Sequence, residues 1–140
     1  MERLSRRSTL LLFGIVALSL GLRLLFLSQK SLWLDEAWSI GISRMHWKSM
    51  WWSAIHQDPN MSVYQCLLHA WMHISQSEFW IRALSVLFGV SSIPAIYVLG
   101  TYILNRSTGL IASLLLAINL FHIQYSQEAC LLYTSDAADE

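Results

Sequence analysis

Three long apolar stretches organise the chain, and a segment rich in tryptophan and histidine separates the first from the other two. Residues 8–27 form an apolar run of about the 20 residues that a spanning helix needs. A second run covers residues 78–104, and a third covers residues 107–124 after a short connection at Asn105 and Arg106. This pattern predicts an all-α, polytopic membrane protein with three transmembrane helices.

The segment between the first and second runs, residues 28–77, contains no stretch long enough to span a bilayer. Trp47, Trp51 and Ile55 recur in it at helical spacing. A second helix is expected to place four apolar side chains on one side, namely Val63, Leu67, Trp71 and Ile74. Because tryptophan is favoured at the membrane–water boundary, both segments are predicted to be helices that lie in the interface.

The first apolar run follows Arg3, Arg6 and Arg7, a basic start that signal peptides share. A cleaved signal peptide would have a shorter apolar core and then a small-x-small site, and no such site follows here. The sequence therefore favours an uncleaved anchor with a cytoplasmic N-terminus. Arg23 lies about one turn from the other end of this run, so its guanidinium is expected to reach up to the lipid headgroups.

Three crossings carry the chain to the face opposite its N-terminus. With that terminus in the cytoplasm, residues 28–77 form a long external loop, and the chain after residue 124 is outside again. Asp35 and Glu128 are consequently expected on the same, extracytoplasmic side of the membrane.

Composition agrees with this picture. Hydrophobic residues make up 55% of the 140 residues and charged residues 13%, whereas a soluble domain carries about a quarter charged residues. The formal net charge is zero and no basic run is dense, so nucleic acid is not an expected partner. Cys66 and Cys130 are too few for a disulfide framework or a zinc site of their own.

Four motifs occur in the order LWLDEAWS, WWSAIHQDP, SEFWIRALSVLFGVSSIPAIYVLG and FHIQYSQEA. Together they resemble the start of a family 39-type glycosyltransferase with the GT-C fold, similar to dolichyl- or polyprenyl-phosphate-sugar-dependent mannosyltransferases and aminoarabinose transferases. The similarity extends from about Ser8 to Ala129. It implies a multi-span enzyme of the bacterial plasma membrane that takes a sugar from a polyprenyl-phosphate donor.

The resemblance places the catalytic base on Asp35, in the first external loop. Glycosyl transfer needs a carboxylate that takes the proton of the attacking acceptor hydroxyl. The alternative for Asp35 is the N-cap of a short helix that begins at Glu36, and the two roles are compatible. Glu36 is a weaker candidate for the substrate site, because adjacent side chains on a helix diverge by about 100°; a solvated surface residue is its alternative.

The remaining candidates for the substrate site are His56, Asp58 and Glu128. Members of the family often carry an acid at the position of Glu128 to handle the donor phosphate or a metal, and a solvated loop acid is the alternative. His56 and Asp58 have side chains that ordinarily bind divalent ions, so a divalent cation is left open as a cofactor. The sequence departs from the family at Cys130, where an arginine is expected, and at residues 60–62, where His-Pro-Pro commonly continues the motif.

Two further polar pairs have alternative explanations. His69 and His73 stand four residues apart, a spacing that can hold zinc, but they lack the glutamate that marks metalloproteases. A polar stripe on an interfacial helix explains them better. Asn119 and His122 lie near the outer end of the third run, where they either line a cavity or bond to a neighbouring helix.

Residues 1–129 are thus expected to be the N-terminal part of a GT-C transmembrane domain. From Cys130 on, the sequence turns small, polar and acidic, where the family would continue into more helices. Residues 130–140 resemble read-through of a sequencing adapter and are interpreted as foreign; a native disordered tail is the alternative. Three spans cannot close a catalytic cavity, so the chain alone is expected to be inactive. Apart from the resemblance, a non-catalytic small membrane protein that serves as an assembly or transport subunit is the competing hypothesis.

Overall fold

The computed structural model describes residues 6–25, 27, 34–56 and 62–128, and in residues 34–36, 38 and 54 it describes the backbone alone. Every regular element in this part of the chain is an α-helix. Two of the helices are long and apolar enough to cross a membrane, α1 (Arg6–Leu24) and α5 (Glu78–Ile103). They confirm the first and second predicted runs as candidate spanning helices, and α5 continues through Pro94 as one helix.

The third predicted run is divided into two helices, α6 (Arg106–Ile118) and α7 (Leu120–Ser126), which meet at an angle of 61°. Asn119 causes the break. Its extended backbone ends α6, and its side-chain oxygen accepts a hydrogen bond from the backbone N–H of His122 at 2.9 Å, which caps α7. The predicted third span is therefore not one continuous helix: the pair is a broken span or a re-entrant segment.

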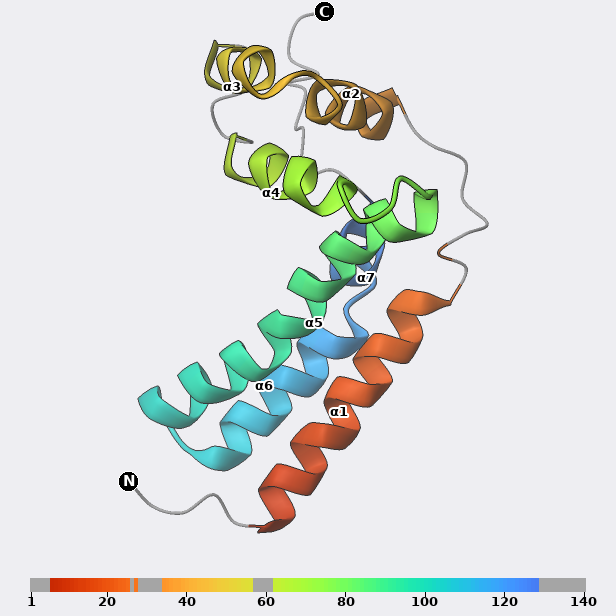
Figure 1. Cartoon of the computed structure of the whole chain (residues 1–140). Helices are drawn as coiled ribbons and strands as arrows, with labels where there is room; N and C mark the ends of the chain where they lie inside the picture. Colours follow the sequence, from red (N-terminus) through yellow and green to blue (C-terminus); the bar gives the residue numbers. More distant parts are fainter. Residues whose placement is uncertain (1–5, 26, 28–33, 57–61, 129–140) are drawn as a thin grey trace, which may run out of the picture. The chain divides into compact units, whose positions relative to one another are not determined.

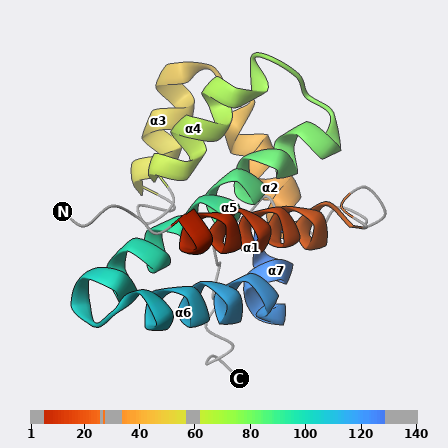
Figure 2. The ribbon, with the colours of Figure 1, turned by 90° about the horizontal axis from the view of Figure 1, so that it is seen from below.

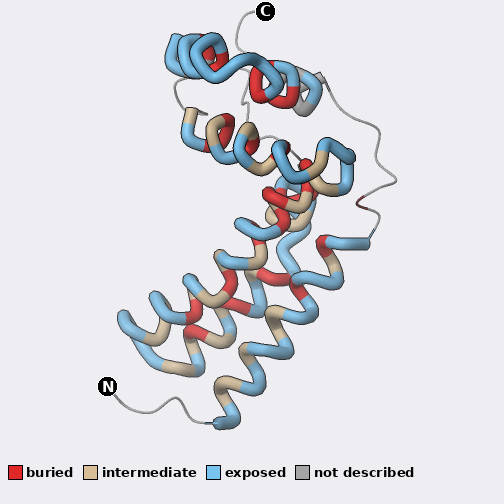
Figure 3. Tube along the Cα trace, in the orientation of Figure 1, coloured by how far each residue is buried: buried red, intermediate tan, exposed pale blue. Residues whose placement is uncertain are grey.

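The described residues belong to two compact units, which divide α5 at residue 86. The first unit, called the apolar bundle here, contains α1, the part of α5 from Val86 on, α6 and α7. In it, α1 and α6 lie side by side along most of their length (Figures 1 and 2). The buried residues of α6 follow a four-residue stripe, Gly109, Ser113 and Ala117 (Figure 3).

Within the apolar bundle, α5 and α6 approach each other closely at two glycines. A Cβ added at Gly109 would lie 2.7 Å from the carbonyl oxygen of Tyr97, and one at Gly100 would lie 2.9 Å from the Cα of Gly109. One turn along, the Ser113 hydroxyl lies 3.3 Å from the carbonyl oxygen of Ile93. Small residues let the backbones of membrane helices come into contact, so dispersion forces and polar contacts can hold the pair together.

The second unit, called the helical layer here, contains α2 (Leu34–Ser43), α3 (Trp47–His56), α4 (Ser62–Met72) and the first two turns of α5. The amphipathic periodicity correctly predicted α3 and α4. The core of the helical layer consists of Ile40, Tyr64, Leu68, Met72, Ile81 and Leu84, with Trp71 packed against it.

The predicted apolar side of α4 packs against this core only through Trp71. Val63 is 74% exposed and Ile74 is 69% exposed, whereas Tyr64 and Met72 are buried. Gln65 of this helix is also fully buried. Helix α4 is apolar on two sides, and periodicity alone does not tell which of them meets protein and which meets a membrane surface.

Two tryptophans fasten α4 to α5 inside the helical layer. Trp71 donates its indole N–H to the carbonyl of Trp80 at 2.8 Å, and Trp80 donates its own to the carbonyl of Trp71 at 3.2 Å. The rings stack with centroids 4.7 Å apart and planes inclined by 7°. The pair combines apolar contact with two reciprocal hydrogen bonds across the turn between the helices.

Replacing Trp71 with phenylalanine keeps most of the ring contact but removes one of these bonds. We expect the free energy of unfolding to fall by about 1 kcal/mol. Trp52→Phe is the matched control, because Trp52 is 59% exposed and stacks on His56 at the surface. Chemical denaturation in detergent, followed by circular dichroism, measures both variants; equal losses would contradict a specific role for the Trp71 indole.

Candidate functional site

The structure places the predicted base at the start of a helix. α2 begins at Leu34, so Asp35 and Glu36 lie in its first turn instead of Asp35 preceding the helix as its cap. A carboxylate in the first turn is favoured by the helix dipole. The side chains of both acids, and the whole of Asp58, lie outside the described residues.

His56 is the last residue of α3 and is exposed. Its Nδ1 donates to the carbonyl of Trp52 at 2.8 Å, and its ring stacks on the indole of Trp52 with centroids 4.5 Å apart. A carbonyl only accepts, so this bond fixes the proton on Nδ1 and leaves Nε2 as an acceptor in the neutral ring. His56 thus offers one ring nitrogen to a ligand at the surface of the helical layer.

His69 and His73 lie with their rings edge to face, 5.1 Å between centroids. His69 also donates from Nδ1 to the carbonyl of Ser43 at 2.7 Å and packs beside Trp47. It therefore connects α4 to the end of α2. Among the described residues no group of three histidine, cysteine or acidic side chains is placed to hold a metal ion.

The ends of α1 and α7 meet at one end of the apolar bundle. The side-chain amide of Gln127 lies 3.4, 3.0 and 2.9 Å from the carbonyl oxygens of Leu22, Arg23 and Leu25. These are carbonyls that the end of a helix leaves without an intrahelical partner, so Gln127 caps α1 from a distant part of the chain. The chain toward Asp35 leaves α1 here, and Glu128, which is half-buried, directly follows Gln127.

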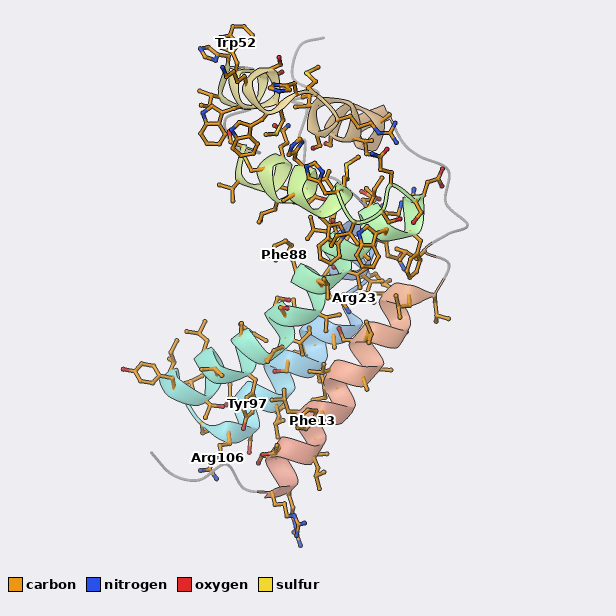
Figure 4. All side chains as sticks on the ribbon, in the orientation of Figure 1. Phe13, Arg23, Trp52, Phe88, Tyr97 and Arg106 are labelled. Carbon is orange, nitrogen blue, oxygen red and sulfur yellow. The ribbon has the colours of Figure 1, made fainter. Side chains whose placement is uncertain are left out.

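Arg23 does not reach toward headgroups as the sequence suggested; it is fully buried at the end of α1, facing α7 (Figure 4). Its guanidinium donates to the hydroxyl of Ser19 at 2.5 Å and to the carbonyls of Ser19 and Ala117 at 3.1 and 3.3 Å. It also donates to the hydroxyl of Ser126 at 3.3 Å and to Nδ1 of His122 at 2.5 Å. Five neutral acceptors from three helices hydrogen-bond to the cation, and these bonds offset the free-energy cost of its burial without contact with water.

A directed chain of hydrogen bonds continues from Arg23 into α5. A guanidinium only donates, so Nδ1 of His122 must be unprotonated and Nε2 must carry the proton. Nε2 lies 3.2 Å from the hydroxyl of Ser92, which in turn donates to the carbonyl of Gly89 at 2.8 Å. The structure thus decides between the two explanations for His122: it bonds to neighbouring helices.

This polar cluster joins α1, α5, α6 and α7, and the sequence contained a signal for it. Ser19 and Arg23 stand four residues apart, and so do His122 and Ser126, which puts each pair on one face of its helix. Polar side chains inside apolar helices usually face protein, and two such pairs in one bundle are each other's natural partners.

No protein-family model, curated protein or solved structure matches this chain, so its membership of a glycosyltransferase family stays a hypothesis based on the sequence motifs.

Proposed function

We propose that the chain is part of a membrane glycosyltransferase of the GT-C type, which moves a sugar from a polyprenyl-phosphate donor to an acceptor on the extracytoplasmic face. The observation that carries this proposal is the contact of Gln127 with the end of α1, 2.9 Å from the carbonyl of Leu25. It holds the end of α1, which precedes Asp35 in the sequence, beside Gln127, which directly precedes Glu128. A shared site for two acids requires this arrangement.

In the proposed mechanism, Asp35 takes the proton of the acceptor hydroxyl as that oxygen attacks the anomeric carbon, and the polyprenyl phosphate leaves. Glu36, His56, Asp58 and Glu128 belong to the substrate site. Such a site also suits a divalent cation, but the described residues offer no group of three ligands.

The proposed setting is a bacterial plasma membrane with the N-terminus in the cytoplasm. α1, α5 and the bent pair α6–α7 would then be three crossings, and the helical layer would lie in the outer interface. Exposed aromatic and apolar side chains support an interfacial position for that layer: Trp47, Trp51, Trp52, Ile55, Val63 and Ile74 are each 44% exposed or more. Tryptophan side chains gain from such a boundary because one edge of the ring is apolar and its N–H can bond to water or headgroups.

The test is made on the complete enzyme of which we propose this chain to be the N-terminal part. Asp35→Asn keeps the size of the side chain but removes the base, so the rate of sugar transfer from a polyprenyl-phosphate donor should fall by about a hundredfold. Glu78→Gln is the matched control, because Glu78 is an exposed acid in the first turn of α5 that the proposal leaves outside the substrate site, so this variant should lower the rate far less. Transfer of radiolabelled sugar in membrane vesicles measures both.

A transfer rate for Asp35→Asn near that of the parent enzyme would sink the assignment of the base. No transfer from any polyprenyl-phosphate sugar by the parent enzyme would instead favour the non-catalytic membrane subunit. In that case the exposed faces of α3 and α4 would be the first surface to test for a partner.

A further inference from the structure

The polar cluster in the apolar bundle holds a buried cation against a titratable side chain. Arg23 is fully buried, and its guanidinium donates to Nδ1 of His122. Arginine keeps its proton at any ordinary pH, whereas histidine changes charge in the physiological range. The hydrogen bond between Arg23 and Nδ1 of His122 therefore depends on whether His122 is neutral.

Protonation of His122 is incompatible with this geometry. With a proton on each ring nitrogen, the imidazolium has two donors and no acceptor, so Arg23 loses its partner at Nδ1. Two positive groups would also stand in hydrogen-bond contact inside a poorly polarisable bundle, where like charges repel strongly. The bond from Nε2 to Ser92 could persist, so the change falls on the α1 side of the ring.

The surroundings offer little to offset that repulsion. The groups in contact with Arg23 and His122 are neutral on every packed element: Ser19 on α1, Ser92 on α5, the Ala117 carbonyl on α6 and Ser126 on α7. Among the described residues, none of these contacts is to a carboxylate, and Arg23 and His122 are the only titratable groups that take part in them. Once His122 is protonated, separation of Arg23 from the ring relieves the repulsion.

A joint for such a movement lies three residues before His122. Asn119 interrupts the helix, and the 61° bend there lets α7 change direction without unwinding α6. On the far side, the Ser126 side chain packs directly against Gly89, so close that an added Cβ at Gly89 would collide with the Ser126 hydroxyl. α7 can thus pivot about Asn119, and its contacts with α1 and α5 are made by His122 and Ser126.

We propose that Arg23 and His122 form a proton-sensitive latch, which holds α7 on α1 while His122 is neutral and releases it when His122 binds a proton. The latched form excludes the proton and the released form accepts it, so the latch is closed at high pH and opens as the pH falls. Release would also separate Gln127 from the carbonyls at the end of α1. The latch does not require the proposed sugar transfer and is tested without it.

The experiment measures distances between spin labels in the full chain, reconstituted in lipid nanodiscs with Cys66 and Cys130 replaced by serine. Labels at Leu20→Cys on α1 and Tyr125→Cys, near the end of α7 away from Asn119, report the latch, since both side chains are exposed. Between about pH 8 and about pH 5, their distance distribution should shift to longer values. A second pair, Leu11→Cys on α1 and Leu115→Cys on α6, should not shift.

Two variants of His122 decide the cause. In His122→Gln the amide oxygen can accept from Arg23 but the side chain binds no proton, so the shift should disappear. In His122→Lys a permanent cation faces Arg23, so the longer distance should be present already at about pH 8. If the lysine variant does not fold, as judged by circular dichroism, the parent and the glutamine variant decide between them. No shift in the parent, the same shift in His122→Gln, or an equal shift in the Leu11–Leu115 pair would each overturn the latch.

Discussion

Replacing His122 with leucine is expected to lower the free energy of unfolding of the apolar bundle by about 3 kcal/mol. The loss does not come mainly from the imidazole itself. It comes from Arg23, which is fully buried and keeps its charge after its acceptor at Nη2 has gone. A buried cation that has lost a partner keeps its desolvation cost, and the lost hydrogen bond no longer offsets it.

The double variant gives this prediction its distinctive form. Arg23→Leu removes the charge, so Arg23→Leu together with His122→Leu should be clearly more stable than His122→Leu alone. Well-packed apolar residues often replace a buried polar cluster at little cost. Unfolding in mixed detergent micelles, monitored by circular dichroism for the two single variants and the double variant, yields the coupling energy. Additive losses would show that Arg23 and His122 do not act as a pair.

A polar residue elsewhere in the molecule serves as the control. His46→Leu changes an exposed histidine of the helical layer, and substitutions at such surface positions usually change stability by at most about 0.5 kcal/mol. A loss as large as that of His122→Leu would point to a general effect of the added leucine.

How far the sequence predicted this fold depends on what each signal measures. Apolar length identified α1 and α5, because a bilayer sets a minimum that few other structures require. Helical spacing of tryptophans identified α3. Neither signal could find the break at Asn119, where the run stays apolar on both sides and no proline or glycine marks the end. Capping by one side chain decides that boundary, and it is visible only in three dimensions.

The predictions for Arg23 and α4 were wrong for a common reason: the environment that surrounds a side chain is not determined by the sequence next to it. Long-chain cations at the end of a span commonly extend to water, so position alone favoured that interpretation of Arg23. Its burial depends on acceptors that arrive from α6 and α7, about 100 residues later in the chain. For α4, a membrane surface accepts apolar side chains as readily as a protein core does. Val63 and Leu68 therefore look equally suited to burial in the sequence, and only Leu68 is buried.

For the candidate site too, the sequence predicted which residues take part but not the tertiary contacts between them. The sequence motifs nominated the acids, and three crossings predicted that Asp35 and Glu128 share a side of the membrane. The contact of Gln127 with the carbonyl of Leu25 is compatible with that prediction. Nothing in the sequence indicated that Gln127 would make it, because a glutamine beside a nominated acid is an ordinary loop residue. The distance between two loop ends depends on tertiary packing, which local patterns do not encode.

The close contact between α5 and α6 leads to the second large effect. In Gly109→Ala the new methyl group would lie 2.7 Å from the carbonyl oxygen of Tyr97 and 3.1 Å from the backbone nitrogen of Thr101. Both are backbone atoms of α5, which cannot rotate away as a side chain could. Relief requires the two helices to separate, and this loses the contacts of Ser113 with Ile93 one turn along. We expect a loss of about 3 kcal/mol in the free energy of unfolding, at the upper end for an added methyl in a packed core.

Gly14→Ala is the matched control for that substitution. Gly14 also lies within an apolar helix, α1, but nothing stands within 4 Å of a Cβ placed there. Alanine forms helices more readily than glycine by about 1 kcal/mol, so this variant should be as stable as the parent or slightly more so. The two substitutions make the same chemical change, and unfolding in mixed micelles should therefore separate them by about 3–4 kcal/mol. Similar stabilities for both would mean that α5 and α6 are not in contact at Gly109. The helix packing that places His122 beside Ser92 and Arg23 would then be contradicted as well.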